Sequence, residues 1–181
     1  LKVKAPRHTV HSRLGMSDEE TEELLDLAGF LSHGVLLPGL QVNQKSALFS
    51  SIAHHLSRSC DASVGEIEAA LWHRERSQNT ALAEGVALTA PMVAGLDRNL
   101  VGVFCTQAPL DYRSPGRPMV DAVIVVLGSP GHRQNQLWLL ERLSRLVLRG
   151  ELLAGLRKAQ TSDEMIEAIQ ASAERVGVPL G

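Results

Sequence analysis

Histidine has the widest chemical scope of any side chain in this sequence, because its neutral ring nitrogen can act as a nucleophile, a base or a metal ligand near neutral pH. The chain holds seven histidines, but none follows another by four residues with a carboxylate alongside, which is the spacing of a helical zinc site. His54 and His55 are adjacent, so on a helix they point in different directions. Cys60 and Cys105 lack the short spacing of metal ligands, and no serine lies in a nucleophile-elbow pattern. The sequence therefore predicts no metal centre and no cofactor, and it disfavours a hydrolase.

The spacing of apolar residues along the chain predicts the helices and strands that position these side chains. Apolar residues that recur roughly every three or four positions indicate amphipathic helices, and short β-branched runs without that period indicate buried strands. Helices are expected at residues 17–30, 48–56, 63–71 and 134–148 and after residue 161, and strands at residues 33–39, 86–88, 100–105 and 122–128. Helices that come before, between and after hydrophobic strands predict an α/β fold with a sheet covered on both faces.

Three of these helices begin with a capping-box pattern, in which a serine or threonine is followed three residues later by a glutamate. The pairs are Ser17 with Glu20, Ser63 with Glu66, and Thr161 with Glu164. We expect a helix N-terminus at each pair, because the two side chains satisfy backbone N–H groups that have no partner within the helix.

The length of 181 residues suits one domain with a well-buried core. We divide the chain into an extended arm at residues 1–16, an accessory helix at residues 17–32 and a main domain at residues 33–181. A net charge of -2 gives no broad positive field for nucleic acid. The longest purely apolar run, residues 122–128, is too short to span a bilayer, and no signal-peptide pattern opens the chain. We therefore expect a cytoplasmic protein that neither binds nucleic acid nor inserts into a membrane.

One stretch of the sequence has an informative order of residues. Residues 74–90 read Arg-Glu-Arg-Ser-Gln-Asn-Thr-Ala-Leu-Ala-Glu-Gly-Val-Ala-Leu-Thr-Ala. This stretch resembles the enzyme IIA domains of the bacterial phosphotransferase system, in their fructose/mannitol and nitrogen-regulatory branch. There a helix ends in Arg-Glu, a small Gly-rich loop with Ser-Thr follows, and a strand reads roughly Gly-Val-Ala-Ile-Pro-His. Residues 108–111, 121–130 and 159–164 are similar to further family segments, so the resemblance covers residues 33–175. It implies a mixed central sheet of about five strands between two layers of helices.

The sequence departs from the family pattern at the positions that carry the family's chemistry. It places Ala90 where the family has the histidine that carries a phosphoryl group, and Gln136 where the family has a second histidine. A register shifted so that Pro91 takes the place of the family proline would put Met92 at the acceptor position, which also lacks an imidazole. Ala81 and Ala83 replace loop glycines, and their Cβ atoms restrict both positive φ and the approach of backbone to an oxyanion. The resemblance thus implies the family's fold without its phosphoryl-accepting chemistry.

Other candidate site residues remain. Arg74, Asn79 and Thr80 lie at positions that the resemblance assigns to anion or partner binding. The alternatives are a structural ion pair for Arg74 and a turn hydrogen bond for Thr80. His132 lies in the turn before the helix that bears Gln136, so it either reaches the old pocket or is an ordinary exposed loop residue.

We expect a regulatory or interaction domain that is not phosphorylated, has no enzymatic activity of its own, and docks onto a protein partner. The partner would be a phosphotransferase component, a transporter or a kinase. Two alternatives stay open: a divergent phosphocarrier that uses His132 as its acceptor, and a sensor of small anions or nucleotides that uses Arg74. From the basic arm, the helix at residues 17–30 and the start at Leu1 rather than Met, we expect the cytosolic part of a longer protein such as a transporter; the alternative is a stand-alone nitrogen-regulatory paralogue. A homodimer is also open.

Overall fold

The computed structural model describes residues 27–83, 85–113, 116, 119–149 and 151–180. Its elements are α2 (Leu27–Ser32), β1 (Val35–Leu40), α3 (Lys45–Leu56), α4 (Val64–Ser77), β2 (Ala81–Ala83), β3 (Val86–Thr89), β4 (Leu100–Leu110), β5 (Val120–Leu127), the 3-10 turn η2 (Pro130–His132), α5 (Arg133–Arg149), α6 (Leu152–Leu156) and α7 (Ser162–Val176). The predicted arm and most of the predicted accessory helix lie outside the described residues. Within the described ranges, no helix is long and apolar enough to cross a bilayer.

The five strands form one mixed sheet in the order β1-β4-β5-β3-β2. β1 runs parallel to β4, β4 antiparallel to β5, β5 parallel to β3, and β3 antiparallel to β2. β5 lies in the middle of the sheet, and all eight of its residues are buried. A strand buried on both faces reads as a continuous apolar run, which is why residues 122–128 were recognisable in the sequence. The predicted α/β fold with a mixed sheet is confirmed.

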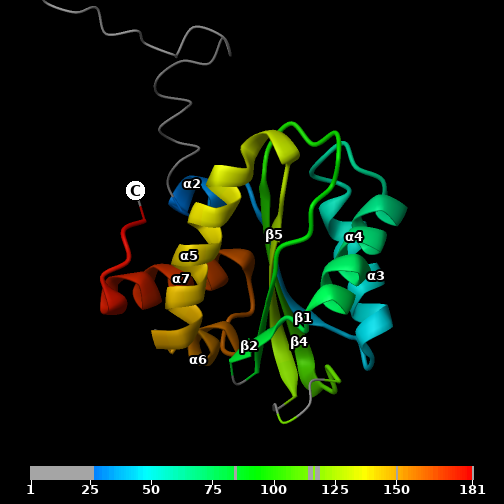
Figure 1. The fold of residues 1–181 in the computed structure, drawn as a ribbon. Helices are drawn as coiled ribbons and strands as arrows, with labels where there is room; N and C mark the ends of the chain where they lie inside the picture. Colours follow the sequence, from blue (N-terminus) through cyan, green and yellow to red (C-terminus); the bar gives the residue numbers. More distant parts are fainter. Residues whose placement is uncertain (1–26, 84, 114–115, 117–118, 150, 181) are drawn as a thin grey trace, which may run out of the picture.

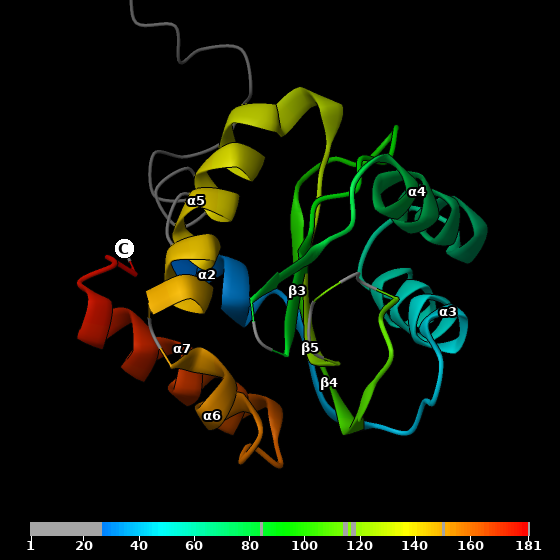
Figure 2. The ribbon, with the colours of Figure 1, turned by 60° about the horizontal axis from the view of Figure 1, so that its bottom comes forward.

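Helices cover both faces of the sheet, as Figure 1 and Figure 2 show. α3 and α4 lie on one face, and α2, α5, α6 and α7 lie on the other. Because side chains along a strand alternate between faces, Val103 and Ile124 join the core under α5 and α7. Phe104 and Val123 join the core under α3 and α4. The two cores together fix the ends of the strands, from which the candidate site residues extend.

Three local features differ from the predicted pattern. β1 begins at Val35 and ends at Leu40, whereas the predicted strand covered residues 33–39. Pro38 is tolerated within β1 because an edge strand can hold a residue without an N–H, and the register is irregular there. β2 and α6 were not predicted, since three and five residues are too few to show a period. β4 extends to Leu110 and β5 begins at Val120, so both strands are longer than expected.

The capping boxes have three outcomes. At α4 the box is complete: Ser63 Oγ accepts from the Glu66 N–H, and the Glu66 carboxylate accepts from the Ser63 N–H. At α7 only one half forms as predicted. Thr161 Oγ1 accepts from the Glu164 N–H, whereas the Glu164 carboxylate accepts from the N–H of Gln160, one residue earlier than a capping box requires. The third predicted box, at residues 17–20, lies outside the described residues.

Candidate functional site

The segment that follows β3 is held against the junction between β5 and α5. Pro91 O accepts from the Gly128 N–H at 2.8 Å, and the Val93 N–H donates to Gly128 O at 3.0 Å. These two bonds enclose an isolated parallel bridge between Met92 and Gly128. Ala90, which is partly buried, therefore stands at the end of β3 immediately before a rigid segment.

Gln136 reaches this segment from the first turn of α5. Its side chain is buried, and Nε2 lies 3.0 Å from Val126 O and 3.4 Å from Pro91 O. A Cβ atom on Gly128 would lie 2.2 Å from Gln136 Nε2 and 2.5 Å from Met92 Sδ, so a side chain at position 128 would force the Gln136 and Met92 side chains to move. An amide and a thioether thus fill the space beside Gly128. The structure thus brings Gln136 close to the segment that contains Ala90: the Gln136 amide lies near the carbonyl of Pro91, the residue that directly follows Ala90.

Arg74 lies near the C-terminal end of α4, and this end of the helix lies near the C-terminal end of β3. The Leu88 N–H donates to Thr80 O at 2.9 Å, which places the turn after α4 beside a residue two positions before Ala90. The Arg74 guanidinium donates to Gln78 O at 3.2 Å and so closes the last turn of its own helix. This bond is local and differs from the ion pair that was the structural alternative for Arg74.

A buried polar network surrounds Thr80. The Glu75 carboxylate accepts from the Thr80 N–H at 3.1 Å and from Thr80 Oγ1 at 2.5 Å. The Lys45 ammonium pairs with the same carboxylate, donates to Tyr112 O at 2.9 Å and lies 3.8 Å from the centre of the Tyr112 ring. Thr80 Oγ1 lies 3.0 Å from the Tyr112 hydroxyl. All four side chains are buried, so the Thr80 hydroxyl has the structural hydrogen-bonding role and faces no open site.

The Tyr112 hydroxyl stays protonated in this network. Burial raises the pKa of Tyr112 above its ordinary range; the hydrogen bond with Thr80 opposes this effect, and the negative charge of Glu75 adds to it. A neutral phenol can donate to Thr80 Oγ1 while Thr80 donates to Glu75, which gives a continuous chain of hydrogen bonds. The network ties α3, α4 and the segment after β4 into one unit.

Asn79 and His132 lie on the edges of this region. Asn79 Oδ1 accepts from the Ala81 N–H at 3.0 Å, and its Nδ2 lies 3.5 Å from Arg113 O. His132 is partly buried in η2, and its carbonyl accepts from Asn99 Nδ2 at 2.9 Å. These bonds position the backbone at residue 132. They do not place the imidazole beside Ala90.

Sequence reasoning missed Lys45, Tyr112 and Asn99. Asn99 also accepts from the Ser129 N–H at 2.8 Å, so it joins the β3–β4 connection to the turn before α5. A single lysine in a first helical turn and a single asparagine before a strand carry no local signal of burial. Their partners lie more than 29 positions away, and only the folded sheet brings them together.

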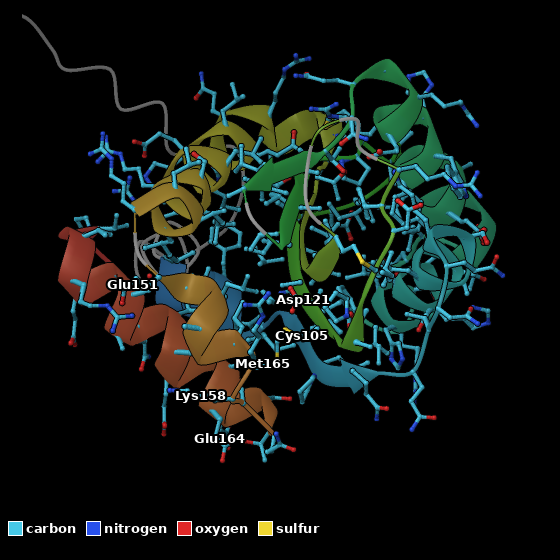
Figure 3. All side chains as sticks on the ribbon, turned by 90° about the horizontal axis from the view of Figure 1, so that it is seen from below. Cys105, Asp121, Glu151, Lys158, Glu164 and Met165 are labelled. Carbon is cyan, nitrogen blue, oxygen red and sulfur yellow. The ribbon has the colours of Figure 1, made fainter. Side chains whose placement is uncertain are left out.

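A second cluster lies at the opposite end of the sheet, seen from below in Figure 3. The buried Asp121 carboxylate accepts from the half-exposed guanidinium of Arg157, with Nε at 2.6 Å from Oδ2. Burial raises the pKa of the Cys105 thiol to about 12, and the negative charge of Asp121 adds to this shift. A thiol that stays protonated is a poor nucleophile and a poor metal ligand. Within the described residues, no three His, Cys, Asp or Glu side chains gather closely enough to hold a metal ion.

Residues 30–172 match the family described as the phosphoenolpyruvate-dependent sugar phosphotransferase system, EIIA 2. The chain belongs to this family. A nitrogen regulatory protein of Bradyrhizobium diazoefficiens is 24% identical over 135 residues, which cover 74% of this chain and 88% of that protein. The suspected relationship to enzyme IIA domains is therefore confirmed.

Solved EIIA structures have the same fold. The nitrogen regulatory protein IIA-Ntr from Neisseria meningitidis superposes with a TM-score of 0.70 at 22% identity, covering 77% of this chain and 94% of that protein. Enzyme IIAMTL from Escherichia coli, in its complex with phosphorylated enzyme IIBMTL, superposes with a TM-score of 0.62 at 13% identity, covering 75% and 93%. At these identities the structural likeness supports the fold alone, so the roles of Ala90 and Gln136 stay a prediction.

Proposed function

We propose that this chain is an EIIA-type domain that cannot accept a phosphoryl group and that acts by docking onto a protein partner. The observation that carries the proposal is the composition of the end of β3: Ala90 directly precedes Pro91, and the buried amide of Gln136 lies 3.4 Å from the Pro91 carbonyl. A phosphoryl relay through histidine requires a nucleophilic ring nitrogen at the acceptor position. Neither a methyl group nor an amide nitrogen, whose lone pair is delocalised, can form that bond.

The hydrogen-bond donors around this site support the same proposal. Stabilisation of a phosphoryl group needs donors that face the incoming oxygens. Here the Thr80 hydroxyl donates to Glu75, the Gln136 amide donates to main-chain carbonyls, and the Arg74 guanidinium donates to Gln78 O. The Thr80 and Gln136 donors are thus occupied within the protein, which makes these two side chains a poor basis for a sensor of small anions. The loss of the nucleophile removes the covalent intermediate altogether.

Docking is supported by exposed apolar side chains beside this site. Met92 and Leu137 are both exposed. Met92 directly follows Pro91 and bridges to Gly128, and Leu137 directly follows Gln136, whose amide lies near the Pro91 carbonyl. Exposed apolar side chains next to a rigid segment are typical of protein interfaces. We infer a partner among phosphotransferase components, transporters and kinases, and a cytosolic location, either as a nitrogen-regulatory paralogue or as the cytosolic part of a transporter. The similarity to a nitrogen regulatory protein supports the first setting.

A phosphorylation assay tests the chemical half of the proposal. The purified chain is incubated with phosphoenolpyruvate and the general phosphotransferase components, with a phosphorylatable IIA domain as the positive control, and intact masses are measured without acid. We expect the control to gain the mass of one phosphate and this chain to gain none. A stoichiometric, acid-labile gain would refute the proposal, and loss of that gain in His132→Ala would establish His132 as the acceptor.

A binding assay tests docking. Fluorescently labelled phosphotransferase components, including a IIB domain, are titrated with the wild-type chain and with two variants. Leu137→Asp places a charge beside the site, whereas Leu148→Asp makes the same change at another exposed apolar position of α5. We expect Leu137→Asp to weaken binding by at least about tenfold and Leu148→Asp to leave it unchanged. Equal effects of the two variants would contradict docking at this site.

A further inference from the structure

A cavity of about 560 Å³ opens between two connections that lie far apart in the sequence. One wall is the connection between α3 and α4, residues 57–63, and the other is the connection between β3 and β4, residues 90–99. The lining residues are Arg58, Ser59, Cys60, Asp61, Leu96, Asp97 and Arg98. The volume lies within the range of roughly 300–1,000 Å³ that is usual for small-molecule sites.

Each wall carries one arginine and one aspartate. Arg58 and Asp61 lie on the first wall, and Asp97 and Arg98 lie on the second. In the part of the chain that the structure describes, none of these four side chains forms an ion pair. Two positive and two negative residues therefore line one cavity without forming ion pairs with one another.

The walls of the cavity are fixed by bonds behind the lining. Leu96 is buried, and its carbonyl accepts from Ser129 Oγ at 2.5 Å. On the other wall the Ser59 N–H donates to Leu56 O at 3.0 Å, and Cys60 Sγ lies 3.3 Å from the same carbonyl. The two connections that carry the charged groups are thus each bonded to the body of the domain, so little ordering of their backbone would be needed on binding.

We propose that this cavity binds a free α-amino acid with an apolar side chain. Arginine guanidinium groups recognise carboxylates, and aspartates accept from ammonium groups. The four charges sum to zero, so a ligand with one charge of each sign and no net charge fits better than a simple anion or cation. Leu96 supplies an apolar surface for the ligand's side chain. This inference does not depend on the proposed function, because no residue of the cavity belongs to the site at Ala90 and Gln136.

The cavity also shares a connection with the candidate docking site. Residues 96–98 belong to the segment that begins at Ala90 and passes through Met92. Both ends of this segment are bonded to the β5–α5 junction, through Gly128 and Ser129. An amino acid bound between the two walls would therefore contact the segment that also carries Met92.

The test is a titration of the isotopically labelled chain with L-leucine, followed by the amide resonances of residues 58–61 and 96–98. Because the lining charges face solvent, we expect weak binding, with a dissociation constant on the order of 1 mM. The matched controls are 4-methylpentanoate, which lacks the ammonium group, and 3-methylbutylamine, which lacks the carboxylate. We expect saturable shifts with L-leucine and none with either control.

Variants locate the binding. The double substitution Arg58→Gln with Arg98→Gln should abolish saturation, whereas Arg76→Gln, an exposed arginine of α4 outside the cavity, should leave the dissociation constant unchanged. The proposal is overturned if L-leucine produces no saturable shifts at these amides, if either control compound binds as tightly, or if the double variant binds like the wild type.

Discussion

Replacing Lys45 by methionine would test how much the buried ion pair with Glu75 stabilises the end of α4. The two side chains are only 10% and 6% exposed. Methionine keeps the length and apolar character of the lysine stem but removes the charge, so the Glu75 carboxylate stays buried without its cation. Removal of one partner of a buried ion pair costs about 3–5 kcal/mol. We expect Lys45→Met to lower the free energy of unfolding by about this amount.

The chain offers a matched control in an exposed pair. Arg145 Nε lies 2.5 Å from Glu141 Oε1, but the two side chains are 56% and 45% exposed. Solvent screens such a pair, and its contribution is about 0.3–0.5 kcal/mol. Arg145→Met should therefore change the free energy of unfolding only slightly, although Arg145 and Glu141 are in direct contact, as Lys45 and Glu75 are.

The measurement is urea unfolding followed by circular dichroism at neutral pH, for the single variants and for Lys45→Met combined with Glu75→Gln. The glutamine amide can still accept from Thr80, and it carries no charge that would need Lys45. The double variant should therefore be less destabilised than the sum of the two single variants. A loss in Lys45→Met no larger than that in Arg145→Met, or strictly additive effects, would refute the role assigned to this network.

Four further outcomes are expected. Gln136→Leu should cost about 1–3 kcal/mol of unfolding free energy, because the carbonyl of Val126 loses its side-chain donor; an unchanged urea midpoint would contradict this. Iodoacetamide at about pH 8 should modify the partly exposed Cys60 and spare Cys105 until the protein unfolds, since burial keeps the pKa of the Cys105 thiol near 12; intact mass spectrometry with and without denaturant would show one and two additions. The stability gained by keeping that thiol protonated is complete below pH 9 and is lost as the pH rises from 9 toward about 12, so alkaline unfolding curves should shift in that window. Arg157→Gln should destabilise the fold by about 1–3 kcal/mol because a buried carboxylate loses its charged donor, and thermal unfolding would detect the change.

Local patterns were sufficient for most of the secondary structure. The complete capping box at Ser63 involves residues three positions apart, so the sequence contains all of its partners. The buried strand β5 was visible as a β-branched run, because a strand covered on both faces is apolar at every position. The short elements β2 and α6 were invisible for the opposite reason, since they are too short to repeat any pattern.

The candidate site was only partly predictable. Residues 74–90 pointed to the EIIA family and to Ala90 from their order alone, and the family is now shown. The role of Thr80 could not be read in the same way. Its hydroxyl is bonded to Glu75, and that carboxylate is paired with Lys45, which is 30 positions before Glu75. A residue type that suits anion binding is thus used for internal structure.

Sequence by itself determined that this chain is an α/β domain of the EIIA family and that no histidine occurs between His73 and His132. These are properties of residue type and order, which need no coordinates. Only the tertiary structure decided that the Gln136 amide fills the space beside Gly128, that Lys45 is buried against Glu75, and that four charged side chains line one cavity. Each of these features combines residues from different elements. The elements lie together because of the order of strands in the sheet, and the packing of the whole domain sets that order.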